Sequence, residues 1–196
     1  MTNQPPFVIA IDGHDGAAKT PICESVKQEL TRRGLSVEIV APFQLAKSFI
    51  PEADIYPYWS DGRAHIAAII LNGITVVHRL LAQSDVVIFD RHWLTVMVEI
   101  YGRDESSLWT EFVPMVFMKC RPEVARLHRK FSYDAPFTGS DEKMQQYYER
   151  YLAVASAFPE LIVLEAEITH KPQDLGPIAL AIVSIIEKNL RVKKTV

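Results

Sequence analysis

The segment from Phe7 to Thr20, FVIAIDGHDGAAKT, constrains the fold more than any other part of this 196-residue chain. Its first six residues are mostly apolar and predict a short buried strand that ends at Asp12. A glycine-bounded turn follows, and then apolar residues recur at helical spacing beyond Pro21. With a second strand predicted over residues 36–41, the order strand, tight turn, helix, strand predicts a βαβ opening and a mostly parallel sheet.

The turn nearly matches G-x-x-x-x-G-K-[ST], the phosphate-binding loop, and we call residues 13–20 the P-loop. In that motif backbone N–H groups converge on a polyphosphate, the lysine neutralises its oxygens, and the hydroxyl ligates Mg²⁺. The match predicts a nucleotide-binding segment with Mg²⁺ at its end, made of Gly13, His14, Asp15, Gly16, Ala17, Ala18, Lys19 and Thr20.

Two residues of this region depart from the motif. Ala18 stands where the last glycine is expected, and Pro21 follows Thr20. If the position of Ala18 needs a positive φ, its methyl group costs about 1 kcal/mol or more. Pro21 removes an N–H and a hydroxyl that could meet the phosphates. Weak nucleotide binding, or a nucleotide-binding protein with impaired catalysis, is therefore one alternative.

The rest of the chain alternates strand and helix patterns. Strands are predicted over residues 36–41, 85–89, 112–118 and 161–164, with helices between them and a closing helix over 173–190. Residues 42–59 read mostly as loop, with a short helix near 44–49, and Gly73 weakens the helix expected over 60–83. Pro114 suits an edge strand or the first residues of a strand. We expect one α/β domain, residues 1–196, with a mostly parallel five-stranded sheet flanked by helices.

Composition narrows the class of protein. Hydrophobic residues make up 48% of the chain and the formal net charge is −3, which favours a globular protein and gives no support for binding a nucleic-acid polymer or a membrane. We expect no secretory signal and no membrane span. Cys23 and Cys120 are expected to be buried, unpaired thiols in a cytoplasmic protein.

Four segments in order, IDGHDGAAKT, VVIFDRHW, RPEVARLHRK and LIVLEAEITHKPQDL, resemble the thymidylate kinase family of P-loop nucleoside-monophosphate kinases. The deoxynucleoside kinases are close relatives of that family. The resemblance covers most of the chain and implies a P-loop NTPase fold. It implies ATP- and Mg²⁺-dependent transfer to a small phosphate acceptor, first of all dTMP, and allows a homodimer.

The resemblance also implies roles for single residues. Asp90 would help Thr20 to hold Mg²⁺, and Arg91 would grip the acceptor phosphate. Asp15 would orient a neighbouring arginine toward the phosphates. Arg63 is the best match for an arginine that contacts the nucleoside monophosphate.

A lid is implied over residues 126–140. It would bring Arg126, Arg129 or Lys130 to the transferring phosphoryl group, which an arginine fork binds in bidentate fashion. The segment near residues 166–171 would approach the donor adenine.

The acceptor is the less determined substrate. A nucleoside hydroxyl would call for a carboxylate near the end of the second strand, but residues 41–44 are Ala-Pro-Phe-Gln. A phosphate acceptor is already nucleophilic, so the sequence favours a nucleoside monophosphate. A deoxynucleoside kinase, or a kinase of another small molecule, remains the alternative.

Overall fold

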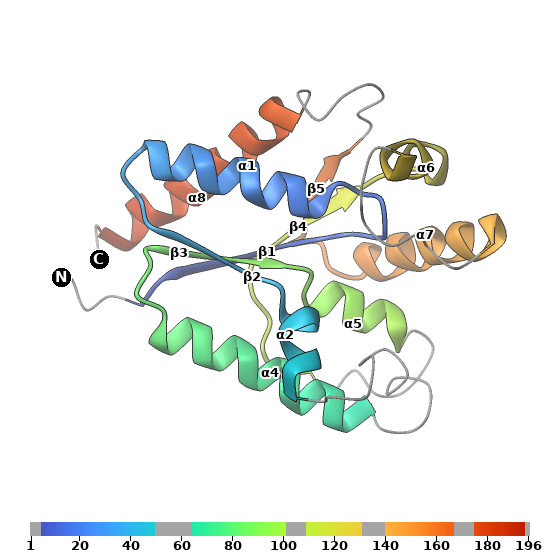
Figure 1. Cartoon of the computed structure of the whole chain (residues 1–196), viewed down its shortest axis with the longest axis horizontal. Helices are drawn as coiled ribbons and strands as arrows, with labels where there is room; N and C mark the ends of the chain where they lie inside the picture. Colours follow the sequence, from blue (N-terminus) through green and yellow to red (C-terminus); the bar gives the residue numbers. More distant parts are fainter. Residues whose placement is uncertain (1–4, 50–63, 101–108, 131–139, 167–174, 195–196) are drawn as a thin grey trace.

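The computed structural model describes residues 5–49, 64–100, 109–130, 140–166 and 175–194 (Figure 1). Five strands form one sheet in the order β2-β3-β1-β4-β5, and each neighbouring pair is parallel. The strands are β1 (Phe7–Asp12), β2 (Val37–Val40), β3 (Val86–Asp90), β4 (Met115–Lys119) and β5 (Ile162–Glu165). The predicted parallel α/β sheet is confirmed.

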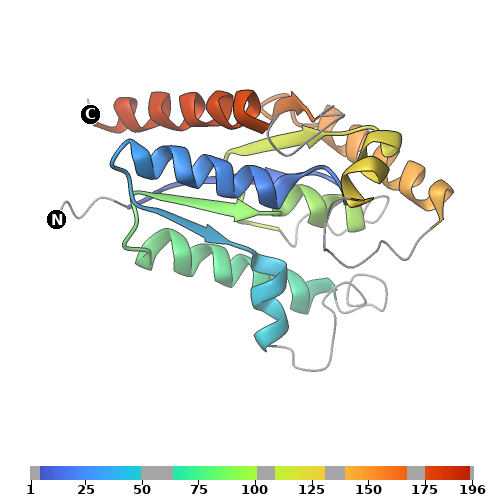
Figure 2. The same cartoon turned by 45° about the horizontal axis from the view of Figure 1, so that its top comes forward.

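Helices cover both faces of the sheet (Figures 1 and 2). One face carries α1 (Lys19–Arg32) and α8 (Gly176–Lys194), and the other carries α2 (Pro42–Phe49), α4 (Ala64–Leu81) and α5 (Trp93–Glu99). The two remaining helices, α6 (Pro122–Lys130) and α7 (Asp141–Ser156), lie at the end of the sheet where β1 runs into α1.

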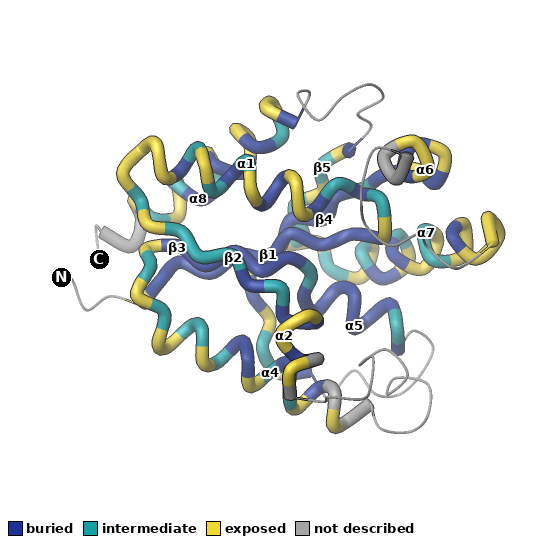
Figure 3. Tube along the Cα trace, in the orientation of Figure 1, coloured by how far each residue is buried: buried dark blue, intermediate teal, exposed yellow. Residues whose placement is uncertain are grey.

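Alternate residues of β1 enter two separate hydrophobic cores. Ile9 and Ile11 pack into the cluster beneath α1 and α8, whereas Val8 and Ala10 pack into the cluster with α4, α5 and α7. A strand buried on both faces needs apolar residues at every position, which is why β1 and β3 read as continuous apolar runs. In the buried-residue colouring of Figure 3, the sheet is dark between two helical layers with exposed outer sides.

Of the two positions predicted for Pro114, the start of a strand is close to what the structure shows, whereas the edge strand is not. The strand begins at Met115, not at Phe112, and it lies between β1 and β5, so the edge position is wrong. Pro114 precedes the strand, and its carbonyl accepts from the Ala10 N–H at 2.8 Å. Because proline supplies only an acceptor there, it does not disturb an interior ladder.

Two helices also differ from expectation. Gly73 lies inside α4 without interrupting it. The short helix α2 begins at Pro42, two residues before the predicted start, with proline in the first turn where its missing N–H is tolerated. Within the described residues, no helix has the length and apolar character needed to cross a bilayer.

Candidate active site

The P-loop lies between the end of β1 and the start of α1, and its glycines allow it to pack tightly. A Cβ on Gly13 would come within 2.7 Å of the Met118 carbonyl oxygen, and one on Gly16 within 2.7 Å of the Ala125 carbonyl oxygen. Gly16 also has a φ of +84°. Both glycines are therefore required by close contact with β4 and α6.

Ala18 adopts the left-handed conformation that the motif reserves for glycine. Its φ is 55° and its ψ is 28°, at the residue that precedes α1. The position of Ala18 therefore does have a positive φ, and for an L-residue this conformation costs about 1–2 kcal/mol. The Ala18 carbonyl accepts from the Ile22 N–H at 3.1 Å. The strain is thus accommodated without loss of the first helical turn.

Lys19 is buried and bends back across the loop. Its ammonium group donates to the His14 carbonyl at 2.8 Å. Burial, helped by the nearby charge of Arg91, lowers the pKa of Lys19 to about 8 despite the raising effect of Asp15, Asp90 and Asp12. A bound anion would favour the charged form of this lysine.

Thr20 and Asp90 bring two oxygen ligands together from different elements. The Thr20 hydroxyl, on α1, donates to a carboxylate oxygen of Asp90 at the end of β3, at 2.5 Å. Mg²⁺ takes one or two protein oxygens together with substrate phosphates and water, so this pair fits the ion. The described residues hold no group of three or more His, Cys, Asp or Glu side chains suited to a metal. A metal site made by protein alone is not found among them.

Arg91 follows Asp90 and turns toward the P-loop. Its own φ is +71°, and its N–H donates to the Ile11 carbonyl at 3.0 Å. Its guanidinium group forms an ion pair with Asp15 and reaches the Gly13 carbonyl at 3.4 Å. Asp15 therefore contacts the neighbouring arginine that the resemblance called for.

Asp12 is a central residue that the sequence reasoning missed. Its buried carboxylate accepts from the Gly13 N–H at 2.6 Å, the His92 N–H at 2.9 Å, and the Thr95 N–H and hydroxyl at 2.9 and 2.6 Å. Asp12, at the end of β1, thereby accepts hydrogen bonds from backbone N–H groups at the start of α5 that have no partner within the helix. The one sequence signal for this role is that Asp12 is an acidic residue at the end of a buried apolar run.

His14 does not face the open side of the loop. It is one of the residues predicted to bind the nucleotide, but its side chain is buried and its two ring nitrogens contact the carbonyls of Asp15 and Cys120. Burial lowers its pKa, and the Lys19 charge adds to that effect, while the two carbonyls raise it. The side chain anchors the P-loop to the end of β4.

Two tyrosines of α7 contact the P-loop or the residues around it. Tyr148 lies edge-on to the His14 ring, with centroids 5.8 Å apart. Tyr151 is buried, stacks on Phe117, and its hydroxyl lies 2.8 Å from that of Thr95. Tyr148 and Tyr151 thus pack against residues that form or support the P-loop.

Tyr147 bonds to a carboxylate that the sequence reasoning also missed. Its hydroxyl lies 3.1 Å from both carboxylate oxygens of Glu99, the last residue of α5. Burial raises the pKa of Glu99, although the Tyr147 hydrogen bond and the charges of Arg91, Arg150 and Lys143 lower it. No sequence motif marks Glu99, because its setting depends on how α5 packs against α7.

His92, whose role the sequence left open, is a buried neutral imidazole. Its Nε2 lies 2.9 Å from the Thr75 hydroxyl, which donates to the Leu71 carbonyl, so Nε2 carries the ring proton. Burial lowers the pKa of His92 to about 3. Its ring packs against Phe89 and Trp109. It therefore belongs to the support of β3 and α4.

The remaining predicted residues are spread more widely. Arg126, on α6, forms an ion pair with Asp141 of α7 at 3.0 Å. Arg63, the side chains of Arg129 and Lys130, and residues 131–139 and 167–171 lie outside the described part. Their roles stay predictions. Cys23 and Cys120 are buried and unpaired, as predicted.

Comparison with known proteins gives likeness in structure but not in sequence. No family model and no curated protein matches the chain. Solved structures of deoxyadenosine kinase from M. mycoides do align. The one with the products dCMP and a flexible dCDP has a TM-score of 0.59 and 15% identity, over 91% of this chain and 99% of that one.

Two further structures of that enzyme agree. The one with bound dATP has a TM-score of 0.58 over 91% of this chain and 100% of that one, and the one with bound dCTP has 0.57 over 91% and 99%, each at 14% identity. At such identities the likeness shows the fold alone. The chain has the α/β fold of the P-loop kinases, and the finer resemblance to thymidylate kinases stays a prediction.

Proposed function

We propose that this protein transfers a phosphoryl group from ATP, with Mg²⁺, to a nucleoside or a nucleoside monophosphate. The convergence of Lys19, Thr20, Asp90 and Arg91 at one end of the sheet carries the proposal. Phosphoryl transfer needs positioned cations more than covalent chemistry, and these residues supply such positions. The likeness in fold to a deoxyadenosine kinase supports the same reaction class.

Thr20 and Asp90 would hold the Mg²⁺, which when bound neutralises charge on the phosphate oxygens. Lys19 would turn from the His14 carbonyl to the polyphosphate. Arg91, kept in place by Asp15, would contact the transferring group from the acceptor side. Arg126 and Arg129 are the proposed lid residues, and Arg63 the proposed contact to a monophosphate.

Two acceptors fit this arrangement. The products bound in one deoxyadenosine kinase structure, dCMP and dCDP, support a deoxynucleoside or its monophosphate. The missing acid at the start of α2 supports a monophosphate such as dTMP, the acceptor that the sequence resemblance implies first.

A nucleotide-binding protein with impaired catalysis is the second candidate function. The observation that favours it is the left-handed conformation of Ala18, where the methyl group adds both strain and bulk beside the phosphate site. Under this alternative MgATP binds, but no acceptor is phosphorylated.

A coupled assay of ADP release tests the proposal, with MgATP and a panel of deoxynucleosides and their monophosphates. We expect turnover with at least one acceptor, and none when Mg²⁺ is replaced by a chelator. Binding of MgATP without turnover on any acceptor would favour the second candidate. Absence of both binding and turnover would contradict the two together.

We also propose that two copies pair through α4. Its outer side carries apolar residues that are half to two thirds exposed: Ile69 at 68%, Val77 at 51%, Leu80 at 66% and Leu81 at 67% (Figure 3). Gly73 lies among them, and a Cβ there would meet nothing within 4 Å, which leaves room for close helix packing. A self-complementary stripe suits a two-fold dimer.

Light scattering on the wild type and on Ile69→Glu tests the dimer. We expect the wild type to be a dimer and Ile69→Glu, which places a charge in the apolar stripe, to be a monomer. Glu187→Lys on α8 is the control and should remain a dimer. A monomeric wild type at micromolar concentration would contradict it.

The two buried, unpaired cysteines suit a reducing compartment, and we propose the cytoplasm.

A further inference from the structure

Glu99 is a half-buried carboxylate with spare capacity to accept hydrogen bonds. Both of its oxygens lie 3.1 Å from one donor, the Tyr147 hydroxyl. That hydroxyl carries a single proton, whereas an ionised carboxylate has about four lone-pair positions. Among the described residues Tyr147 is the one hydrogen-bond donor to this carboxylate, which leaves lone pairs for a donor from outside the chain.

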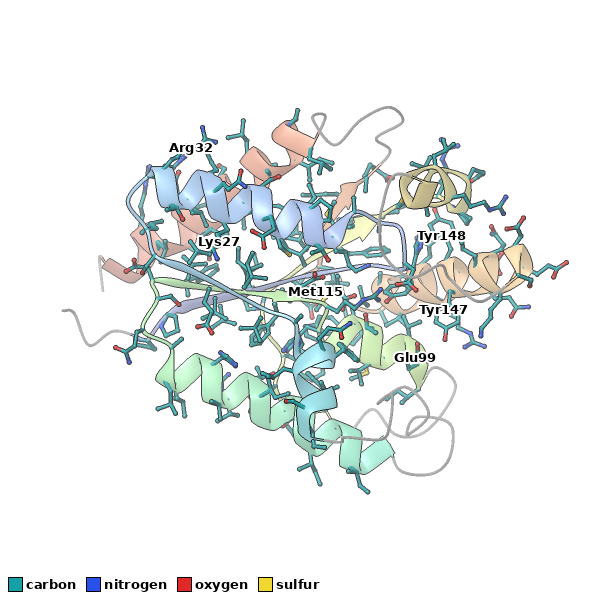
Figure 4. The ribbon with its side chains drawn as sticks, viewed as in Figure 1. Lys27, Arg32, Glu99, Met115, Tyr147 and Tyr148 are labelled. Atoms are coloured by element: carbon teal, nitrogen blue, oxygen red, sulfur yellow. The ribbon has the colours of Figure 1, made fainter. Side chains whose placement is uncertain are left out.

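Glu99 lies at the same end of the molecule as the P-loop. The Arg91 charge acts on it, and the same Arg91 reaches the Gly13 carbonyl and Asp15. Its partner Tyr147 is next in sequence to Tyr148, whose ring contacts the P-loop residue His14. Figure 4 shows Glu99, Tyr147 and Tyr148 where α5 and α7 approach the loop.

The charges around Glu99 come from two elements. Arg91 follows β3, while Lys143, Arg150 and Tyr147 belong to α7, with Arg150 5.7 Å from the centre of the Tyr147 ring. Burial outweighs these influences and raises the pKa of Glu99. A carboxylate with a raised pKa accepts a proton more readily at neutral pH and is suited to act as a general base.

We propose that Glu99 is the catalytic base that takes the proton of an acceptor hydroxyl, and that the acceptor is therefore a nucleoside. In this step the acceptor O–H bond breaks and its proton passes to a Glu99 oxygen. The acceptor oxygen bonds to the γ-phosphorus of ATP, the bond from that phosphorus to the β–γ bridging oxygen breaks, and ADP leaves. Tyr147 is a positioning residue, since it holds the carboxylate.

This inference rests on the proposed function and chooses between its two acceptors. A monophosphate acceptor needs no base and brings two negative charges, which the Glu99 carboxylate would repel. A nucleoside brings a neutral hydroxyl that must lose its proton. The end of α5 thus supplies the acid that is missing from the start of α2, although no sequence motif marks this helix.

The test compares the wild type with Glu99→Gln, which keeps the size and the Tyr147 contact but cannot take a proton. We expect kcat with a deoxynucleoside to fall by about 10²–10⁴-fold, with MgATP affinity unchanged. Glu149→Gln, an exposed acid on α7 that bonds to Gln145, is the matched control and should leave kcat unchanged.

Tyr147→Phe gives a second, independent readout. The Tyr147 hydroxyl lowers the pKa of Glu99, so its removal should move the acidic limb of the kcat profile to higher pH. Glu99→Gln should abolish that limb. If Glu99 and Tyr147 only packed, the acidic limb would stay unchanged in both variants. Thermal unfolding of each variant would show whether it had failed to fold.

The outcomes separate the two proposals. Turnover by the wild type with a nucleoside, lost in Glu99→Gln, supports the inference. Turnover of Glu99→Gln within threefold of the wild type, or wild-type transfer to monophosphates alone, overturns the inference and keeps the proposed kinase. A wild type that neither binds MgATP nor releases ADP overturns both.

Discussion

The P-loop and the α5–α7 wall lie at the same end of the sheet but are built in different ways. The P-loop is one continuous segment whose glycines and Lys19 form a recognisable local motif. The wall consists of Glu99, Tyr147 and Tyr148, from two helices that meet only in the fold. The first can be read from spacing along the chain. The second exists only after packing.

The two regions also differ in how their charges are held. Lys19, Asp15 and Arg91 contact one another or loop carbonyls, and Thr20 contacts Asp90. Glu99 has a neutral hydroxyl as its hydrogen-bond partner, with the cations acting from farther away. The P-loop is thus suited to stabilise charge, and the wall to accept a proton.

Lys19→Ala should have the largest effect on the P-loop side. Removal of the cation that we propose to contact the polyphosphate should lower kcat/KM by about 10²–10³-fold in the ADP-release assay. Lys27→Ala, farther along the same helix and labelled in Figure 4, is the control and should retain activity. Equal activity of the two variants would contradict the catalytic role of Lys19.

Asp12→Asn should have the largest effect on stability, since Asp12 joins the P-loop to α5. An amide can accept at only one of its two ends, so buried donors from Gly13, His92 or Thr95 would lose their partner. We expect a loss of about 2–4 kcal/mol in urea unfolding. Asp141→Asn, an exposed residue, should change stability by less than about 0.5 kcal/mol. A similar loss of free energy of unfolding in both variants would contradict the structural role of Asp12.

His92, buried between β3 and α4, should make the stability of the protein sensitive to acid. Its folded-state pKa, about 3, lies below its ordinary value of 6.5, so the unfolded chain binds a proton that the native protein does not. The contribution of the neutral His92 to the free energy of unfolding is full above pH 6.5. It falls by about 1.4 kcal/mol per pH unit as the pH drops toward 3. Urea unfolding at pH 7 and pH 5 should show a smaller loss for His92→Gln than for the wild type. An equal loss would assign the acid sensitivity elsewhere.

Ala18→Gly should have the smallest effect on stability. Glycine relieves the left-handed strain but adds freedom to the unfolded chain, so we expect a gain between zero and about 1 kcal/mol. MgATP affinity should rise as well. Ala17→Gly, whose φ is not positive, should be destabilised. If Ala18→Gly lost both stability and affinity, the methyl group would be a functional part of the loop.

Much of the fold follows from the sequence because its signals are local. Continuous apolar runs gave the strands, and the turn after Asp12 placed the P-loop. The position of Pro114 could not be settled, because a proline before an interior strand and one on an edge strand look alike until the neighbouring Ala10 N–H is located.

The site residues likewise fall into those that local motifs mark and those whose partners are distant in the sequence. The P-loop residues, Asp90 and Arg91 lay in motifs, so their proximity could be expected. The buried orientation of His14 depends on the Cys120 carbonyl, 106 residues farther along the chain. The setting of Glu99 likewise depends on Tyr147, 48 residues away. Side-chain partners at such separations follow from packing, which spacing alone does not encode.

Calorimetric titration of MgATP into the wild type and into Lys19→Ala tests the central claim most directly, that this loop binds a polyphosphate despite Ala18. We predict saturable binding of one nucleotide per chain, weakened at least tenfold in the variant and lost without Mg²⁺. Equal binding by both proteins, or no binding by the wild type at millimolar nucleotide, would contradict it.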